Sequence, residues 1–159
     1  MKPACVWAGC TLLLALAFAP VQASGGTESA GTVVRYTTAK SFADVIFDLN
    51  FAITDRNFRI TGRNTIGAGL RDRGYTDFPD VEVVHFCSLE RAREVLLIDP
   101  GFVAQMPCRI TVHAHDGATI ISVIMLPLDH PDARVNAFSR RLNAMLTDIA
   151  EFIVTPAGQ

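Results

Sequence analysis

The sequence has no surplus of positive charge. Its 159 residues contain 14 lysines and arginines against 16 aspartates and glutamates, for a formal net charge of −2. Only two of the basic residues, Lys2 and Lys40, are lysines. Non-specific nucleic-acid binding requires a dense basic surface, so we expect no nucleic-acid partner.

The sequence also lacks the compact motifs that identify several kinds of active site. It contains no C-x-x-C pair, no glycine-rich phosphate loop and no complete zinc-ligand motif. No nucleophile lies beside an evident base, as covalent catalysis would require. We therefore expect no cofactor, and we favour a protein without catalytic activity of its own over an enzyme.

The longest apolar run lies at the N-terminus, from residue 4 to residue 19. It is shorter than the ~20 residues that a membrane-spanning helix needs. Lys2 precedes the run, and a V-Q-A cleavage motif ends at Ala23. Cys10 resembles a lipidation site, but it precedes most of the apolar run instead of following it. We expect residues 1–23 to be a signal peptide cleaved near Ala23, a periplasmic or secreted mature protein, and no stable membrane span after cleavage.

The remaining chain is long enough for one domain with a hydrophobic core. Residues 24–31 are small, polar and glycine-rich, as in a flexible leader. We expect the domain to span residues 32–156. Two cysteines remain after cleavage, Cys87 and Cys108. An even number of cysteines in an oxidising compartment favours a disulfide between them.

Hydrophobic periodicity predicts the elements of this domain. Alternating and β-branched segments predict strands near residues 32–38, 58–63, 81–87, 108–115 and 118–126. Amphipathic spacing predicts one long helix after Ser41 and another after Pro131, with short helical segments on both sides of the third strand. The order β-α-β-β-β-β-α indicates an α+β fold, with a mainly antiparallel five-stranded sheet and both long helices on one face. The core-facing stripe of the last helix is predicted to be Val135, Phe138, Leu142, Met145, Ile149 and Phe152.

The other face of the predicted sheet is free for water, a ligand or a partner. Strand alternation places a set of basic side chains on this open face. They are Arg35, Arg59, Arg63, Arg109, His113 and His115. Such a surface suits a carboxylate, a phosphate or a sulfur oxyanion. A solvated sheet face or a dimer interface fits the same pattern.

Cys87 and Cys108 end the third strand and begin the fourth. If these strands are adjacent and antiparallel, the two cysteines lie at the same end of the sheet and can form a disulfide. The alternative is a redox-active pair, because Cys87 precedes a predicted helix and a helix N-terminus lowers a thiol pKa. The separation of the pair by twenty residues favours the structural disulfide.

Two histidines, His113 and His115, lie two residues apart on one strand and point to the same side. They could chelate one metal ion, with His85 or Cys87 as a further ligand from the neighbouring strand. Two ligands do not make a structural or catalytic zinc set, so we favour surface and turn histidines and predict no bound metal.

A spaced set of packing and turn residues also resembles a known family, the domain of unknown function 302 family. The matching residues are Phe86-Cys87, Ala92, Leu96-Leu97, Pro100, Pro107-Cys108-Arg109-Ile110, Val112 and Asp116-Gly117. The similarity extends from about residue 33 to the final helix. It implies a TBP-like α+β fold that is often dimeric, and it implies no particular activity.

Three hypotheses of function follow. The first is an exported binding or accessory module, expected to form a homodimer, that binds a small anionic ligand on the open face. The second is a thiol-redox or metal-dependent protein that uses Cys87, Cys108 and the nearby histidines. The third is a structural homodimer in which the open face is buried.

Overall fold

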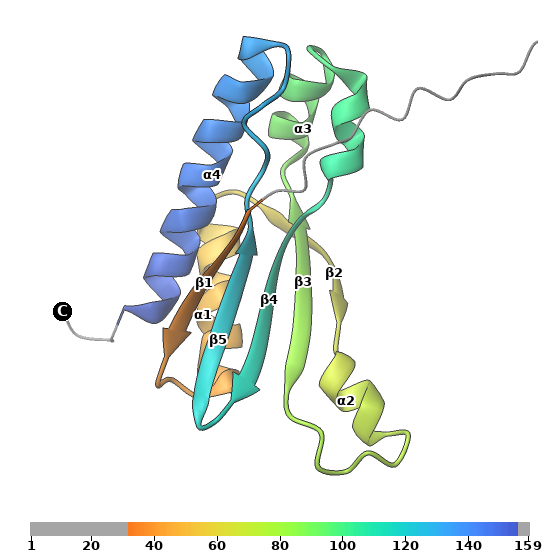
Figure 1. The fold of residues 1–159 in the computed structure, drawn as a ribbon, viewed down its shortest axis with the longest axis vertical. Helices are drawn as coiled ribbons and strands as arrows, with labels where there is room; N and C mark the ends of the chain where they lie inside the picture. The colour runs from red at the N-terminus through yellow and green to blue at the C-terminus, as the bar shows by residue number, and fades with distance from the viewer. Residues whose placement is uncertain (1–31, 156–159) are drawn as a thin grey trace, which may run out of the picture.

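Five antiparallel strands form one open sheet in the order β1-β5-β4-β3-β2 (Figure 1). The computed structural model describes residues 32–155, so the predicted signal peptide, the whole leader and Pro156 lie outside the described residues. The strands are β1 Val33–Thr38, β2 Arg59–Asn64, β3 Val81–Cys87, β4 Cys108–His115 and β5 Ala118–Ile124. The predicted five-stranded antiparallel sheet is confirmed.

Two long helices, α1 (Phe42–Asp55) and α4 (Ala133–Val154), pack against each other and cover one face of this sheet (Figure 1). Two shorter helical segments, α3 (Leu89–Leu96) and η1 (Pro100–Gln105), connect β3 to β4 at one end of the sheet. A third short helix, α2 (Ile66–Arg71), connects β2 to β3 at the opposite end. The predicted α+β fold, with both long helices on one face, is confirmed. No helix within residues 32–155 has the length and apolar character to cross a membrane.

Local sequence explains where these elements begin and end. The Ser41 hydroxyl accepts a hydrogen bond from the backbone N–H of Asp44 and so caps α1. The Asp132 carboxylate caps α4 in the same way through the N–H of Arg134. Asp116 and Gly117 both have positive φ, at 48° and 76°, as a two-residue hairpin turn between β4 and β5 requires.

The core lies between the sheet and the helix layer. It includes the inward residues of β3, β4 and β5 and the buried sides of α1 and α4. One part of the prediction for α4 is wrong. Phe152 is 40% exposed, whereas Leu146 and Ile153 are almost fully buried. The buried stripe continues from Leu142 in steps of four, three and four residues, and this phase turns Phe152 outward.

A bulge in β2 changes which way its last residues point. Ile60 lies opposite Phe86 of β3, but Gly62 lies opposite His85, so β2 has one extra residue at this point. The alternation of side chains is therefore reversed after the bulge. Residues before it keep the predicted orientation, and residues after it do not.

The prediction that Arg63 lies on the open face is therefore wrong. Arg63 follows the bulge and forms an ion pair with Glu82, a buried residue on the helix-covered side of β3. Its guanidinium also donates to the side-chain carbonyl of Asn50 on α1. Arg63 thus links the sheet to the helix layer, whereas Arg59 lies opposite Cys87, before the bulge.

Candidate ligand-binding groove

The remaining predicted ligand residues are spread across the open face of the sheet. Arg109 on β4 lies opposite His85, whose Nε2 is 2.7 Å from Oδ1 of Asn64. Arg35 lies on β1, and β5 separates it from β4. Two strand spacings are about 10 Å, so Arg35 and Arg109 are too far apart to clasp one small anion from both sides.

Apolar side chains lie between these basic residues. Val81 and Val83 of β3 and Ile120 and Ile124 of β5 are only half-buried, because no helix within residues 32–155 covers this side of the sheet. Val33 at the outer edge is 45% exposed. The open face is therefore mixed in character and is better suited to a broad contact than to a small ligand.

The structure does not bring the three candidate metal ligands together. The rings of His113 and His115 lie 6.5 Å apart, and His115 Nε2 is 3.2 Å from a carboxylate oxygen of Asp116. His85 lies opposite Arg109, four residues along β4 from His113, which corresponds to about 13 Å. Within residues 32–155 no group of three potential ligands is arranged to hold a metal ion.

The two cysteines lie close together at one end of the sheet. β3 and β4 are adjacent and antiparallel, and Cys108 lies opposite Phe86, the neighbour of Cys87. Both cysteines line one small cavity, together with Phe102 of η1. The structure contains both residues as free thiols, so the disulfide remains a prediction.

Burial dominates the acid–base chemistry of both thiols. It raises the pKa of Cys108 to about 11, with a further contribution from the charge of Cys87. Burial also raises the pKa of Cys87, and this outweighs the opposing hydrogen bond to the backbone of Ser88. The expectation that the helix N-terminus lowers the Cys87 pKa is therefore wrong.

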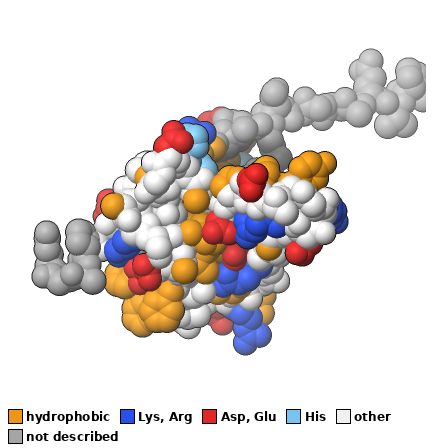
Figure 2. Space-filling model, turned by 90° about the horizontal axis from the view of Figure 1, so that it is seen from below, with side chains coloured by type: hydrophobic (Ala, Val, Ile, Leu, Met, Phe, Trp, Pro, Cys, Tyr) orange, Lys and Arg blue, Asp and Glu red, His pale blue; other side chains and the backbone are white. Residues whose placement is uncertain are grey.

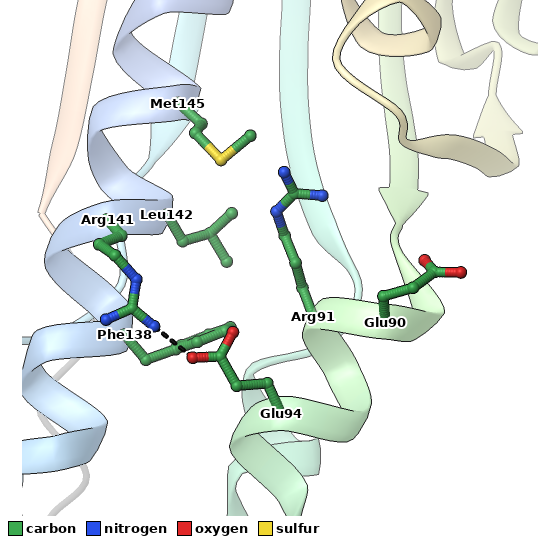
Figure 3. A pocket seen from close by; sticks show the side chains of 7 residues that line it. All are labelled: Glu90, Arg91, Glu94, Phe138, Arg141, Leu142 and Met145. Carbon is green, nitrogen blue, oxygen red and sulfur yellow. Dashed lines mark hydrogen bonds and ion pairs between the residues drawn. The ribbon is translucent and has the colours of Figure 1, made fainter.

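A groove lies between α3 and α4, directly beside this cavity (Figure 3). The groove has a volume of about 410 Å³, within the range of small-molecule sites. Its lining residues are Glu90, Arg91 and Glu94 of α3 and Phe138, Arg141, Leu142 and Met145 of α4.

The α4 side of the groove is mainly apolar. Phe138 and Leu142 belong to the core and show only an edge to the groove, whereas Met145 is half-buried. Phe138 also packs edge-to-face against Phe102 of η1, with 5.6 Å between ring centroids. Core packing therefore holds this wall in place.

The charged residues of the groove have different environments. Glu94 and Arg141 form an ion pair across it (Figure 3). The carboxylate of Glu90 accepts a hydrogen bond from the Ser88 hydroxyl at 2.9 Å and points away from the groove. Each of these three charged groups thus has a partner or faces away from the groove.

Arg91 is the exception, because its guanidinium points into the space between the two helices (Figure 3). Its Nη1 is 3.3 Å from the Ser88 hydroxyl, and its guanidinium carbon is 4.8 Å from the centroid of the Phe58 ring. None of the ion pairs found within residues 32–155 includes Arg91. A positive charge with free hydrogen-bond donors therefore faces an apolar wall.

Sequence reasoning did not find this site. Arg91 and Phe138 are far apart in the chain, and only the packing of α3 beside α4 brings them together. The segment E-R-A-R-E has the charges of an ordinary solvated helix. The available signal was weak, because two arginines and two glutamates on one short helix do not show which of them faces a groove.

The fold and the groove define a small α+β domain with a partly apolar concavity that contains the guanidinium of Arg91. Residues 34–149 match the model of a family described as Domain of unknown function DUF302, so the chain belongs to this family. The predicted family resemblance is thus confirmed. No curated protein matches the chain.

A solved structure supports the same fold. The chain is similar to the crystal structure of an uncharacterised conserved DUF302 protein from Bacillus stearothermophilus, with a TM-score of 0.68 and 14% sequence identity. The alignment covers 76% of this chain and 97% of that chain. At this identity the similarity establishes the fold only.

Proposed function

We propose that this protein is an exported binding module without catalytic activity of its own, and that the groove between α3 and α4 binds a small anion with an apolar chain. The observation that carries the proposal is the guanidinium of Arg91, which faces the groove without a carboxylate partner. Arginine binds carboxylates through two parallel hydrogen bonds. The wall formed by Phe138, Leu142 and Met145 can remove an alkyl or aryl chain from water.

The groove fits this ligand better than the open face does. Arg91 lies within one concavity with its apolar wall, whereas Arg35 and Arg109 are separated across the sheet. The groove also has two glutamates, Glu90 and Glu94, against its two arginines, so its lining carries no net positive charge. A ligand with one charge is therefore favoured over a polyphosphate, which the glutamates would repel.

Calorimetry with octanoate tests this proposal, with octylamine as the probe of opposite charge. Octanoate should bind and octylamine should not. Arg91→Ala should weaken octanoate binding by about 10-fold or more, because a hydrogen bond to a charged group contributes roughly 1.5–3 kcal/mol. Arg93→Ala is the matched control, since Arg93 is an exposed arginine on the same helix.

Two outcomes would contradict the proposal. Equal binding of octanoate and octylamine would show that Arg91 does not select for charge. Unchanged octanoate binding by Arg91→Ala, with the fold preserved by circular dichroism, would place the ligand elsewhere.

Export is part of the same proposal, supported by the apolar N-terminal run and the cleavage motif at Ala23. Intact mass of the protein from the host envelope fraction should correspond to a chain that begins near Ser24. A mass that retains residues 1–23 would contradict cleavage.

The cysteine environment supports a structural disulfide over a redox-active pair. High pKa values keep both thiols protonated at neutral pH, and a thiol is a much weaker nucleophile than a thiolate. The same non-reduced sample should therefore be 2 Da lighter than the dithiol. A free pair that alkylates rapidly at pH 7 would favour thiol-redox chemistry instead.

A structural homodimer is the second candidate function, and the half-buried valines and isoleucines of the open face support it. Light scattering of the mature chain should then give twice the monomer mass. Val83→Glu should produce monomers, whereas Leu97→Glu, at a 71%-exposed position in the turn after α3, should not. A monomeric wild-type protein would eliminate this candidate.

A further inference from the structure

Three phenylalanines on the outer side of the helix layer are exposed to solvent. Phe47 is 73% exposed, Phe51 53% and Phe152 40%. Phe47 and Phe51 lie one turn apart on α1, and the ring of Phe51 stacks on that of Phe152 at a centroid distance of 5.6 Å. Seen from below, hydrophobic side chains gather on this side of the molecule (Figure 2). Exposed aromatic residues clustered in this way are typical of interaction surfaces.

Acidic residues surround this cluster. Five of them lie within four residues of one of the phenylalanines: Asp44, Asp48, Asp55, Asp148 and Glu151. All except Asp48 are exposed. We call the three phenylalanines and these five acids the acidic aromatic face.

The two cations at this face are already engaged. Nζ of Lys40 is 2.9 Å from the carboxylate of Asp48 and also donates to the carbonyl of Ile153. Arg56 donates to the carbonyls of Ala52 and Asp148, and its guanidinium lies 5.6 Å from the centroid of Phe152. The rim therefore presents mainly negative charge to an incoming molecule.

We propose that the acidic aromatic face docks a basic amphipathic helix of a partner protein. The apolar side of such a helix covers the phenylalanines, and its lysines or arginines meet the acidic rim. Charge excludes the other obvious occupants. A symmetric contact with a second copy brings two acidic rims together, and an anionic membrane repels the rim in the same way.

This inference does not depend on the function of the groove. The groove uses residues 138–145 of α4, whereas the acidic aromatic face uses the end of that helix and α1. Loss of ligand binding at Arg91 would therefore leave the docking proposal intact, and the reverse is also true.

Fluorescence anisotropy with a labelled model peptide tests the proposal on the mature protein. The probe is an 18-residue amphipathic helix made of leucine and lysine, and its counterpart has glutamate in place of lysine. The Leu/Lys peptide should bind, more weakly at 0.5 M than at 0.05 M salt, and the Leu/Glu peptide should not. Phe47→Ser/Phe51→Ser should weaken binding by 10-fold or more, because buried aromatic anchors dominate such interfaces.

Leu89→Ser/Leu97→Ser is the matched control, since these residues of the α3 region are 79% and 71% exposed but lie outside the face. The control should bind the Leu/Lys peptide like the wild type. The proposal would be overturned if both double variants lost peptide binding equally, or if the Leu/Lys and Leu/Glu peptides bound equally well. Two other results would also overturn it, if peptide binding stayed unchanged in the Phe47→Ser/Phe51→Ser variant. One is loss of a self-associated state in this variant, and the other is loss of its binding to phosphatidylglycerol vesicles.

Discussion

Replacement of Arg63 by methionine should destabilise the protein, whereas the same replacement of Arg59 should not. The two arginines lie four residues apart on one strand, and regular alternation would give them equivalent environments. The bulge separates them: Arg63 pairs with the buried Glu82 and with Asn50, while Arg59 is exposed. The two variants therefore measure the consequence of a single extra residue in β2.

The expected magnitude follows from burial. The side chain of Glu82 is 11% exposed and that of Arg63 is 31% exposed, so the pair lies between a surface and a buried ion pair. Surface pairs contribute about 0–1 kcal/mol, and loss of one partner from a buried pair costs about 3–5 kcal/mol. After allowance for solvent at Arg63, we expect Arg63→Met to cost about 2 kcal/mol, mainly because Glu82 keeps its charge without a partner. Arg59→Met should change the stability by less than about 0.5 kcal/mol.

Urea denaturation followed by circular dichroism gives both values. A cost of about 2 kcal/mol corresponds to a shift of roughly 1 M in the urea midpoint. Addition of Glu82→Gln to the Arg63→Met variant should restore part of the lost stability, because residue 82 then carries no unpaired negative charge. Equal effects of Arg59→Met and Arg63→Met, or no recovery in the double variant, would refute this reasoning.

Two further predictions concern the cysteine pair and the packing of α2. In the reduced protein, the pKa of Cys108 is raised from 9.0 to about 11. The stability should be unaffected below pH 9 and should fall by about 3 kcal/mol between pH 9 and 11, because the thiol of the unfolded chain ionises first. Urea titrations at pH 8 and 11 check this, and a fall of the same size in Cys108→Ala would contradict it. Gly67→Ala should cost about 1–3 kcal/mol in thermal unfolding, because its Cβ would lie 2.5 Å from the carbonyl oxygen of Pro79. Gly62→Ala is its control, since a Cβ there has no atom within 4 Å, and equal costs would refute the packing argument.

Much of the fold could be predicted because its signals are local. Alternation in the strands, the Ser41 cap and the Asp116-Gly117 turn each depend on a few neighbouring residues. The two-residue turn between β4 and β5 then makes these strands antiparallel neighbours. The order of elements in the sequence was therefore sufficient for the α+β class.

The predictions that were wrong have a common cause. At each of these positions the local sequence allowed two arrangements, and packing against the rest of the protein determined which one forms. In α4, both Phe152 and Ile153 are apolar, and only the contact with the sheet and α1 selects which one is buried. In β2, the pattern of residues does not reveal a bulge, yet the bulge moves Arg63 from one face to the other. Burial likewise decides the direction of the Cys87 pKa shift against the helix N-terminus.

The candidate site was the least predictable feature because it belongs to no single element. Arg91 reaches its position through Ser88 and Phe58, and the opposite wall comes from α4, far along the chain. Sequence alone identified basic residues and suggested an anionic ligand as a hypothesis to test. It could not show that the basic residues of the open face are dispersed.

The α4 helix connects the two surfaces that we propose for binding. Met145 lies at the groove and Phe152 at the acidic aromatic face, seven residues apart, which corresponds to about 10 Å along the helix. The two proposed sites therefore share no residue. The α4 helix contributes residues to both sites, and its buried side is fixed in the core by Leu146 and Ile149. A rigid, well-packed connection of this kind favours independent binding, so the module can hold a ligand while it is attached to a partner.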